Sequence, residues 1–172
     1  MWYAMQIKSG NEELIRQLCD ATISRDILTE CFYPRSERFW KKNGEKRIVV
    51  KPLFPGYLFL NTNAIREVEA ALWQIPELTK VLKVGQASIP IQEEEKEYIL
   101  RHGDADYVFI MSRGYMVGPY VKIEEGAFAG YYGKLLYLDR HNRYGVMEAQ
   151  MFGSRIELEF GLEITDKRDL EL

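Results

Sequence analysis

Hydrophobic and polar positions follow two different patterns along the chain, and the change falls beyond residue 101. In the first part, apolar side chains recur at helical spacing, and the three helices are predicted over residues 11–24, 65–75 and 91–101. Between them lie short apolar and aromatic runs, and strands are predicted at residues 2–7, 31–34, 57–60 and 78–84. This order of elements is typical of an α+β fold, with helices on one face of a mostly antiparallel sheet.

Local signals sharpen these boundaries. Ser9, followed three residues later by Glu12, has the spacing of a capping box at the start of the first helix. Asn43-Gly44 predicts a tight hairpin turn between the segments 35–40 and 46–51. Pro76 is expected to end the second helix.

From Tyr115 onward the helical pattern is absent. Short alternating strands are separated by turns at the glycines 118, 126, 130, 133, 145, 153 and 161, and this predicts a small all-β barrel of about 50 residues. Residues 102–114 fit neither pattern and are the best candidate for a linker. The predicted organisation is therefore an N-terminal domain over 1–101, a linker over 102–114 and a barrel over 115–172.

Composition narrows the class of protein. The 172 residues are 47% hydrophobic and 28% charged, which is ordinary for a globular protein and argues against disorder. No apolar run approaches the roughly 20 residues that a membrane span needs, and no secretory signal is visible at the N-terminus. Two cysteines are too few for a disulfide scaffold, so a reduced, cytoplasmic location is expected.

Charge is unevenly distributed. The net charge of −3 argues against a ribosomal-type protein that coats RNA, since such proteins are strongly basic. Residues 35–51 nevertheless contain seven basic and two acidic residues. This segment is either a local nucleic-acid contact or simply a solvated hairpin tip.

The sequence contains no recognisable catalytic or metal-binding motif. The two histidines and two cysteines lack metal-ligand spacing. The glycines at 126, 130 and 133 precede an alternating strand rather than a helix, so they predict turns and not a phosphate-binding loop. We therefore expect a binding protein without enzymatic activity, metal or cofactor.

Aromatic residues gather around one turn. Phe54, Tyr57 and Phe59 flank Pro55-Gly56, and strand alternation places Tyr57 and Phe59 on one face and Leu58 and Leu60 on the other. Such aromatics either belong to the core or form an apolar patch that docks a partner.

Four segments resemble a known family. Residues 2–12 and the Phe54-Pro55-Gly56-Tyr57-Leu58-Phe59 segment resemble the N-terminal domain of NusG-type transcription elongation factors. Residues 121–134 resemble the KOW motif of their C-terminal barrel, and residues 151–158 resemble its later hairpin. The resemblance covers nearly the whole chain in the right order.

This resemblance implies an NGN-type sandwich joined by a linker to a KOW barrel. It implies a monomeric factor that docks on the clamp helices of the largest RNA polymerase subunit, bridges the DNA cleft and favours processive elongation. The barrel would recruit RNA, a termination factor or a ribosomal protein. The expected polymerase-binding residues are Trp2, Tyr3, Phe54, Tyr57 and Phe59.

Two features suggest a specialised paralog of the LoaP type, an operon-specific antitermination factor that recognises an RNA hairpin. Several housekeeping members carry an Asn-Thr pair where this chain has Gln74-Ile75, and the barrel has a basic turn at 140–143. A general NusG-type factor is the alternative, and a ribosomal-type RNA-binding structural protein is the rival from another class.

Two basic clusters are the expected nucleic-acid contacts. In the family the N-terminal hairpin lies near upstream DNA, and the barrel turn is the candidate for RNA. With ten acidic and seven basic residues over 118–172, RNA binding would require the barrel's charges to gather on one face. The candidate residues are Arg35, Arg38, Lys41, Lys42, Lys46 and Arg47 in the hairpin, and Lys134, Arg140, His141, Arg143 and Arg155 in the barrel.

Overall fold

The computed structural model describes residues 1–74 and 88–169, and these form two compact units. The first unit comprises residues 1–33, 54–96 and 151–153, and the second comprises 34–53, 97–150 and 154–172. The strand predicted at 78–84 lies outside the described residues. The predicted domain boundaries stay a prediction, because compactness does not measure independent folding.

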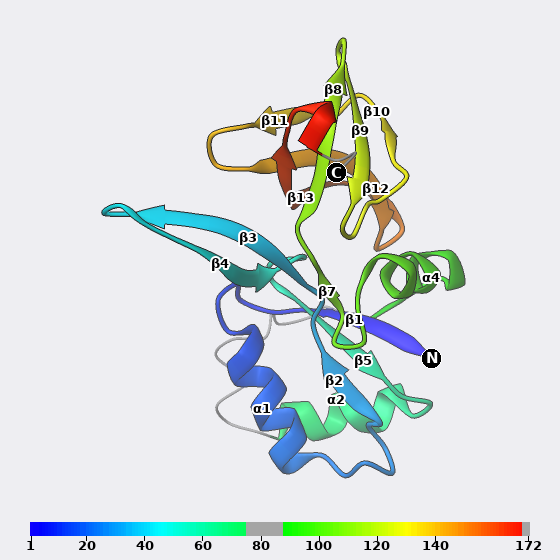
Figure 1. Cartoon of the computed structure of the whole chain (residues 1–172). Coiled ribbons are helices and arrows are strands. Elements are labelled where there is room, and N and C mark those ends of the chain that lie inside the picture. Colours follow the sequence, from blue (N-terminus) through cyan, green and yellow to red (C-terminus); the bar gives the residue numbers. More distant parts are fainter. Residues whose placement is uncertain (75–87, 170–172) are drawn as a thin grey trace. The chain divides into compact units, whose positions relative to one another are not determined.

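The first unit is a four-stranded antiparallel sheet with helices (Figure 1). Its strand order is β2-β5-β1-β6. The elements are β1 (Trp2–Gln6), α1 (Glu12–Thr22), β2 (Glu30–Phe32), β5 (Tyr57–Asn61), α2 (Ile65–Trp73) and β6 (Ile89–Pro90), followed by the start of α4 (Glu93–His102). The predicted helices and the strands at residues 2–7, 31–34 and 57–60 are thus confirmed to within a few residues.

Helices α1 and α2 pack against one face of this sheet. Leu58 and Leu60 of β5 are fully buried in the same cluster as Ile15 of α1 and Leu72 of α2. Cys19 lies in this cluster too, as expected for a small core residue. The other face of β5 carries Tyr57 and Phe59, so the predicted alternation is confirmed.

The predicted capping box is wrong. Asn11, not Ser9, is the N-cap residue of α1, and its side chain makes no capping hydrogen bond. The Glu12 carboxylate is instead buried and accepts hydrogen bonds from the backbone N–H groups of Gly10 (2.9 Å) and Gly56 (2.8 Å). The acidic residue expected to cap a helix therefore fixes a distant turn.

The second unit contains two sheets. A six-stranded sheet has the order β10-β9-β8-β13-β12-β11, in agreement with the small all-β barrel, and a three-stranded sheet has the order β4-β3-β7. The strands are β3 (Arg35–Lys42), β4 (Glu45–Pro52), β7 (Val108–Phe109), β8 (Ser112–Val117), β9 (Tyr120–Glu125), β10 (Tyr132–Gly133), β11 (Tyr137–Asp139), β12 (Tyr144–Met151) and β13 (Ser154–Ile164), with a 3-10 helix at Lys167–Asp169.

Strands β3 and β4 form the predicted hairpin. Asn43 and Gly44 have φ angles of 51° and 79°, the left-handed values that a two-residue turn of this kind requires. Lys41 faces Lys46 across the ladder, and β7 pairs with the base of β3 in parallel.

Residues 102–114, the predicted linker, contain the end of α4, strand β7 and the start of β8. Phe109 of β7 is buried and lies 5.8 Å from the Phe128 ring. Three glycines expected in turns lie within strands instead, namely Gly133, Gly145 and Gly161. None of the helices within 1–74 and 88–169 is long and apolar enough to span a membrane.

Candidate functional site

The sheet face opposite α1 and α2 carries a cluster of aromatic rings. The rings of Trp2 and Phe32 are 4.8 Å apart, and those of Phe32 and Phe59 are 5.4 Å apart. Phe54 lies 5.9 Å from Phe59. We call the group formed by Trp2, Phe32, Phe54, Tyr57 and Phe59 the aromatic face.

The turn at Pro55-Gly56 positions this face. Gly56 has a φ of +83°, and a Cβ atom there would lie 3.3 Å from the carbonyl oxygen of Ile7. The Gly56 N–H donates to the buried Glu12 carboxylate, and Gln6 Nε2 donates to the Tyr57 hydroxyl at 2.6 Å. The first strand and the first helix therefore hold Tyr57 in place from two sides.

The aromatic face is not left open, contrary to one of the two readings of the sequence. Trp2, Phe54 and Phe59 are at most 5% exposed. Phe152, at the tip of the β12–β13 hairpin, stacks on Tyr57 with ring centres 4.0 Å apart and planes inclined by 9°. Only Tyr57 and Phe152 remain partly exposed among these residues.

Two local features hold the Phe152 tip, whose residues 151–153 belong to the first unit. The buried Glu95 carboxylate accepts hydrogen bonds from the backbone N–H groups of Gln92 (2.9 Å) and Gly153 (3.0 Å). Phe152 and Gly153 have φ angles of 58° and 73°, which closes the hairpin in two residues.

Sequence reasoning grouped Tyr3 with Trp2, Phe54, Tyr57 and Phe59 as expected polymerase-binding residues, and it missed Phe152. Tyr3 packs instead against the core cluster beneath α1 and α2, because neighbouring residues of a strand point to opposite faces. Phe152 could have been noticed as a large apolar residue before a glycine between two alternating strands. Nothing in the sequence, however, indicates which surface it contacts.

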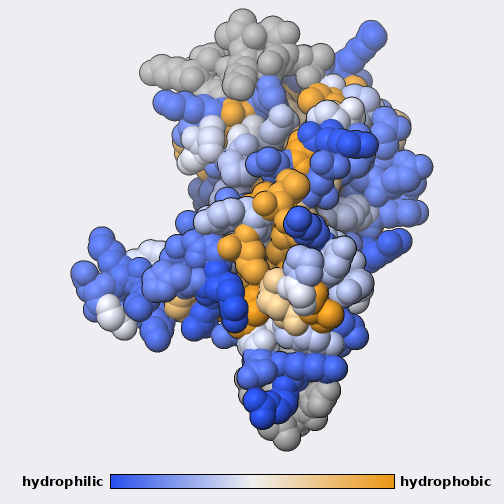
Figure 2. Space-filling view, turned by 90° about the horizontal axis from the view of Figure 1, so that it is seen from above, coloured by the Kyte–Doolittle hydropathy of each residue, from blue (hydrophilic) through white to orange (hydrophobic). Residues whose placement is uncertain are grey.

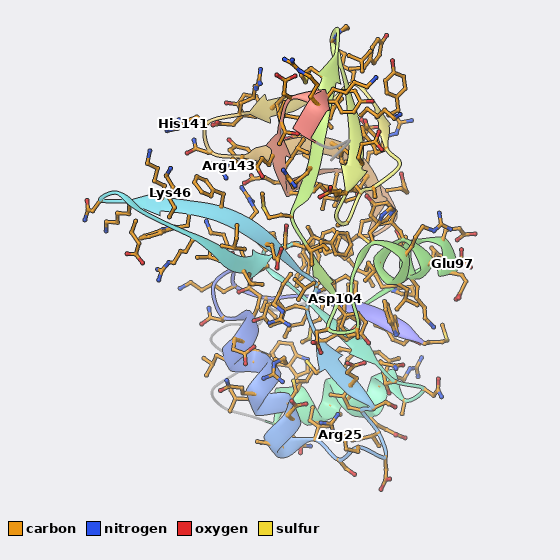
Figure 3. The ribbon with its side chains drawn as sticks, viewed as in Figure 1. Arg25, Lys46, Glu97, Asp104, His141 and Arg143 are labelled. Atoms are coloured by element: carbon orange, nitrogen blue, oxygen red, sulfur yellow. The ribbon has the colours of Figure 1, made fainter. Side chains whose placement is uncertain are left out.

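The two predicted basic clusters lie in the same unit. We call the tip of the β3–β4 hairpin, residues 40–47, the basic hairpin, and residues 140–143 between β11 and β12 the barrel turn. Figure 3 shows Lys46, His141 and Arg143 on the same side of this unit. In Figure 2 the hairpin is the arm at the left, and its surface is mostly hydrophilic. The exposed cationic side chains are Lys41, Lys42, Lys46, Arg47, Arg140 and His141.

Arg38 and Arg143 have other partners. Arg143 pairs with Glu163 at 3.2 Å, and its guanidinium lies 4.1 Å from the centre of the Phe39 ring. Arg38 pairs with Glu159 and lies 5.0 Å from the centre of the Tyr144 ring. These two arginines therefore connect β3 to the barrel strands.

The remaining candidates are distributed more widely. Arg35 lies at the base of the hairpin, where its side chain donates to the carbonyl oxygen of Asp106 at 3.4 Å. Arg155 pairs with Glu148 at 3.6 Å, and Lys134 is exposed after β10. Neither Lys134 nor Arg155 contacts the hairpin or the barrel turn in any ion pair or ring contact that the described residues make.

The barrel turn has a well-defined conformation. Asn142 donates to both carboxylate oxygens of Asp139, from its backbone N–H and its side chain, each at 2.8 Å. These hydrogen bonds lower the pKa of Asp139 because they stabilise its carboxylate form. Arg143 follows with a φ of 54°.

Comparison with known proteins identifies the family. The family model described as "Transcription termination factor nusG" matches residues 1–100. The chain belongs to the NusG family. Members of this family are non-enzymatic transcription factors that bind RNA polymerase, which confirms the expectation that the chain is not an enzyme.

Full-length relatives agree with this assignment. The chain is 24% identical to the transcription termination/antitermination protein NusG of Halalkalibacterium halodurans, over 92% of this chain and 94% of that protein. It is 25% identical to NusG of Thermus thermophilus, over 92% and 95%. A solved structure titled "Domain interaction in Thermotoga maritima NusG" matches with a TM-score of 0.52 and 21% identity, covering 93% of this chain and 92% of that one, which supports the shared fold.

The described residues contain no group of three or more His, Cys, Asp or Glu side chains that could hold a metal ion. What this NusG-family chain presents at its surface instead is the Tyr57 edge of the aromatic face and the pair of basic clusters.

Proposed function

We propose that this protein is an operon-specific transcription elongation and antitermination factor of the LoaP type. It docks on the clamp helices of the largest RNA polymerase subunit, holds the clamp closed across the DNA and so favours processive elongation. It acts by shifting the population of polymerase conformations rather than by chemistry. A cytoplasmic location follows from this role.

The observation that carries the docking proposal is the aromatic face. Its turn is fixed by the buried Glu12 carboxylate, and Tyr57 presents a partly exposed ring at its edge. Aromatic side chains held rigidly at a surface are typical anchors of protein interfaces. We infer that Tyr57 is the principal anchor, while Phe54 and Phe59 support it from within.

The specialised role is supported by the basic clusters. In family members the N-terminal hairpin lies near upstream DNA, and phosphate contacts by Lys and Arg supply most of the affinity of such surfaces. The exposed Arg140 and His141 of the barrel turn are the candidates for an RNA hairpin, with Tyr144 beside them.

A general NusG-type factor is the second candidate. The full-length similarity to curated termination/antitermination proteins favours it, as does the acidic balance of the barrel. In that case the barrel binds a termination factor or a ribosomal protein instead of RNA.

Transcription across an intrinsic terminator with purified RNA polymerase tests the proposal. We expect the protein to increase read-through on templates that encode its RNA element, and to have little effect on templates without it. Equal effects on both templates would favour the general factor. Co-sedimentation with ribosomes rather than with polymerase would favour the ribosomal-type alternative.

Docking is tested separately with Tyr57→Ala. If Tyr57 is an anchor, polymerase binding weakens by about 1–3 kcal/mol. Thermal unfolding measures the separate loss of stability that follows from removing the Phe152 stacking and the Gln6 hydrogen bond. Trp73→Ala is the matched control, because Trp73 is 44% exposed on α2, away from the aromatic face. Phe54→Ala is unsuitable as a binding test, since removing a buried phenylalanine costs about 3–5 kcal/mol of stability.

A further inference from the structure

The basic hairpin contributes little to the core. Strand β4 is exposed along almost its whole length, and all residues from Lys41 to Ile48 are exposed. Lys41 and Lys46 are direct cross-strand partners. Like charges at such positions destabilise a strand pair, a cost that a bound polyanion would relieve.

The base of the hairpin is fixed to the barrel by contacts on both sides of β3. The Glu37 carboxylate accepts a hydrogen bond from the Met111 N–H at 2.8 Å, and Arg38 pairs with Glu159. Arg143 of the barrel turn stacks on Phe39. The hairpin and the barrel turn therefore have a defined relation within the second unit.

Gly161 of β13 makes this arrangement possible. A Cβ atom at this position would collide with the backbone carbonyl oxygen of Glu37, so β3 can approach β13 this closely only because residue 161 is glycine. Relieving the collision would require β3 to move away from the barrel.

Because β3 packs closely against β13, the exposed cations of the basic hairpin lie near those of the barrel turn. At about 3.3 Å per strand residue, Lys41 lies roughly 7 Å along β3 from the Phe39–Arg143 contact. Arg140 and His141 lie three and two residues before Arg143 in the barrel turn. Lys42 and Arg140 are each three residues from that contact, so at about 3.3 Å per residue the set spans at most about 20 Å along the backbone. This length matches about six base pairs of a duplex at roughly 3.4 Å each.

Most acidic groups near this surface are already engaged. Glu159 and Glu163 pair with Arg38 and Arg143, and Asp139 accepts the hydrogen bonds of Asn142. Glu45 faces Lys42 at the hairpin tip. Tyr137, which is 53% exposed and lies 5.8 Å from Tyr144, offers a ring on which a base can stack.

We propose that the basic hairpin and the barrel turn form one site, which binds a single segment of nucleic-acid backbone. Lys41, Lys42, Lys46 and Arg140 contact phosphates, and Arg38 and Arg143 position the two elements. This inference rests on the proposed function, but it replaces two separate contacts, one with DNA and one with RNA, by a shared one.

Fluorescence anisotropy with the full chain tests the proposal. The probes are a labelled stem-loop RNA of about 12 base pairs, roughly twice the span of the surface, and a DNA duplex of the same length. The stoichiometry should be one probe per protein. The triple variant K41Q/K42Q/K46Q and the variant R140Q should each weaken binding of the same probe. The slope of log K against log salt should fall by about one for each lost phosphate contact.

Two variants separate one shared site from two independent ones, because neither changes any charge. Gly161→Ala forces β3 from β13, and Phe39→Ala removes the ring beneath Arg143. With one shared site, both weaken probe binding severalfold; with independent sites, affinity is unchanged. Phe39→Ala keeps the test valid if Gly161→Ala fails to fold. K8Q/R25Q/R66Q, which removes three exposed cations of the first unit, is the charge-matched control and should bind nearly as well as the parent chain.

Three results would overturn the proposal: two probes bound per protein, unchanged affinity in a folded Phe39→Ala variant, or no binding of either probe at low salt. A difference in affinity between the two probes shows whether the site prefers an RNA or a DNA backbone. Either preference is consistent with one shared site. Terminator read-through measures the proposed function independently, so a factor that acts on polymerase without binding either probe is recognised as such.

Discussion

Two buried glutamates each do the same task in the first unit. Glu12 and Glu95 are at most 4% exposed. Each carboxylate accepts hydrogen bonds from two backbone N–H groups that lie outside helices and strands. Glu12 fixes the Pro55-Gly56 turn, and Glu95 fixes the tip that carries Phe152. A buried carboxylate is tolerable only because these hydrogen bonds replace water.

Replacing Glu12 tests this role. In Glu12→Gln the amide offers one acceptor oxygen for two donors, so we expect the free energy of unfolding to fall by about 2 kcal/mol. Chemical denaturation measures the change. Glu13→Gln, on the exposed side of the same helix, serves as the control and should cost much less. A Glu12→Gln variant as stable as the parent chain would show that water or another group satisfies Gly56.

Glu13 governs a different property, the response to acid. Hydrogen bonding to Arg16, together with weaker hydrogen bonds to Gln17 and Tyr33, lowers the pKa of Glu13 to about 2. Because the folded pKa lies below the unfolded value, its contribution is present above about pH 4.5 and is lost as the pH falls towards 2. The pair is half exposed, so this contribution is about 0.5 kcal/mol. Acid titration of Glu13→Gln against the parent chain should show that difference at pH 6 and none near pH 2.

At the scale of elements, periodicity located helices and strands well, and interactions between elements were the main source of error. The predicted capping box at Ser9 does not form, because the Glu12 carboxylate accepts a hydrogen bond from the Gly56 N–H in a turn 44 residues away. Tyr3 was grouped with Trp2 in the expected docking set, yet neighbouring residues of a strand point to opposite faces, and Tyr3 packs against the core cluster. Gly161 was expected in a turn, since close approach of another strand leaves no signal in the local sequence.

The hairpin tip that carries Phe152 makes an element-scale prediction possible. If the aromatic face docks on polymerase, the Phe152 ring competes for the surface of Tyr57, and only molecules with the tip displaced bind. Phe152→Ala should therefore strengthen polymerase binding severalfold, since apparent affinity scales with the population of molecules in which Tyr57 is uncovered. Competition binding with labelled polymerase measures this.

Tyr132→Ala is the matched control, because it removes an aromatic ring that is 57% exposed elsewhere in the barrel. Unchanged or weaker polymerase binding by Phe152→Ala would mean that Phe152 is part of the docking surface rather than its cover.

For the whole molecule, the sequence predicted the fold class and the family, but it did not show which distant segments pack together. The predicted linker 102–114 contains a strand that pairs with β3, and Phe109 is buried within it. Pairing between segments 73 residues apart depends on packing that no local pattern encodes. For the same reason, the hairpin and the barrel turn were predicted as separate clusters.

Limited proteolysis tests the linker. Residues 104–106 are the longest exposed run in this stretch, so we expect the first cut there, followed by two stable fragments visible by mass spectrometry. If the chain stays whole, or if the first cut falls at the hairpin tip, residues 102–114 do not act as a linker.

Strand β4 has one further consequence, for the behaviour of the protein in concentrated solution. Among the described strands it pairs only with β3, and it exposes Ile48 and Val50. An open strand edge with apolar side chains invites a second copy to add its own strand, and flanking lysines prevent this by mutual repulsion. Because salt screens that repulsion, light scattering should show a monomer at low ionic strength and growing self-association as ionic strength rises. The lysines that would attract phosphate thus also keep one molecule from adhering to the next.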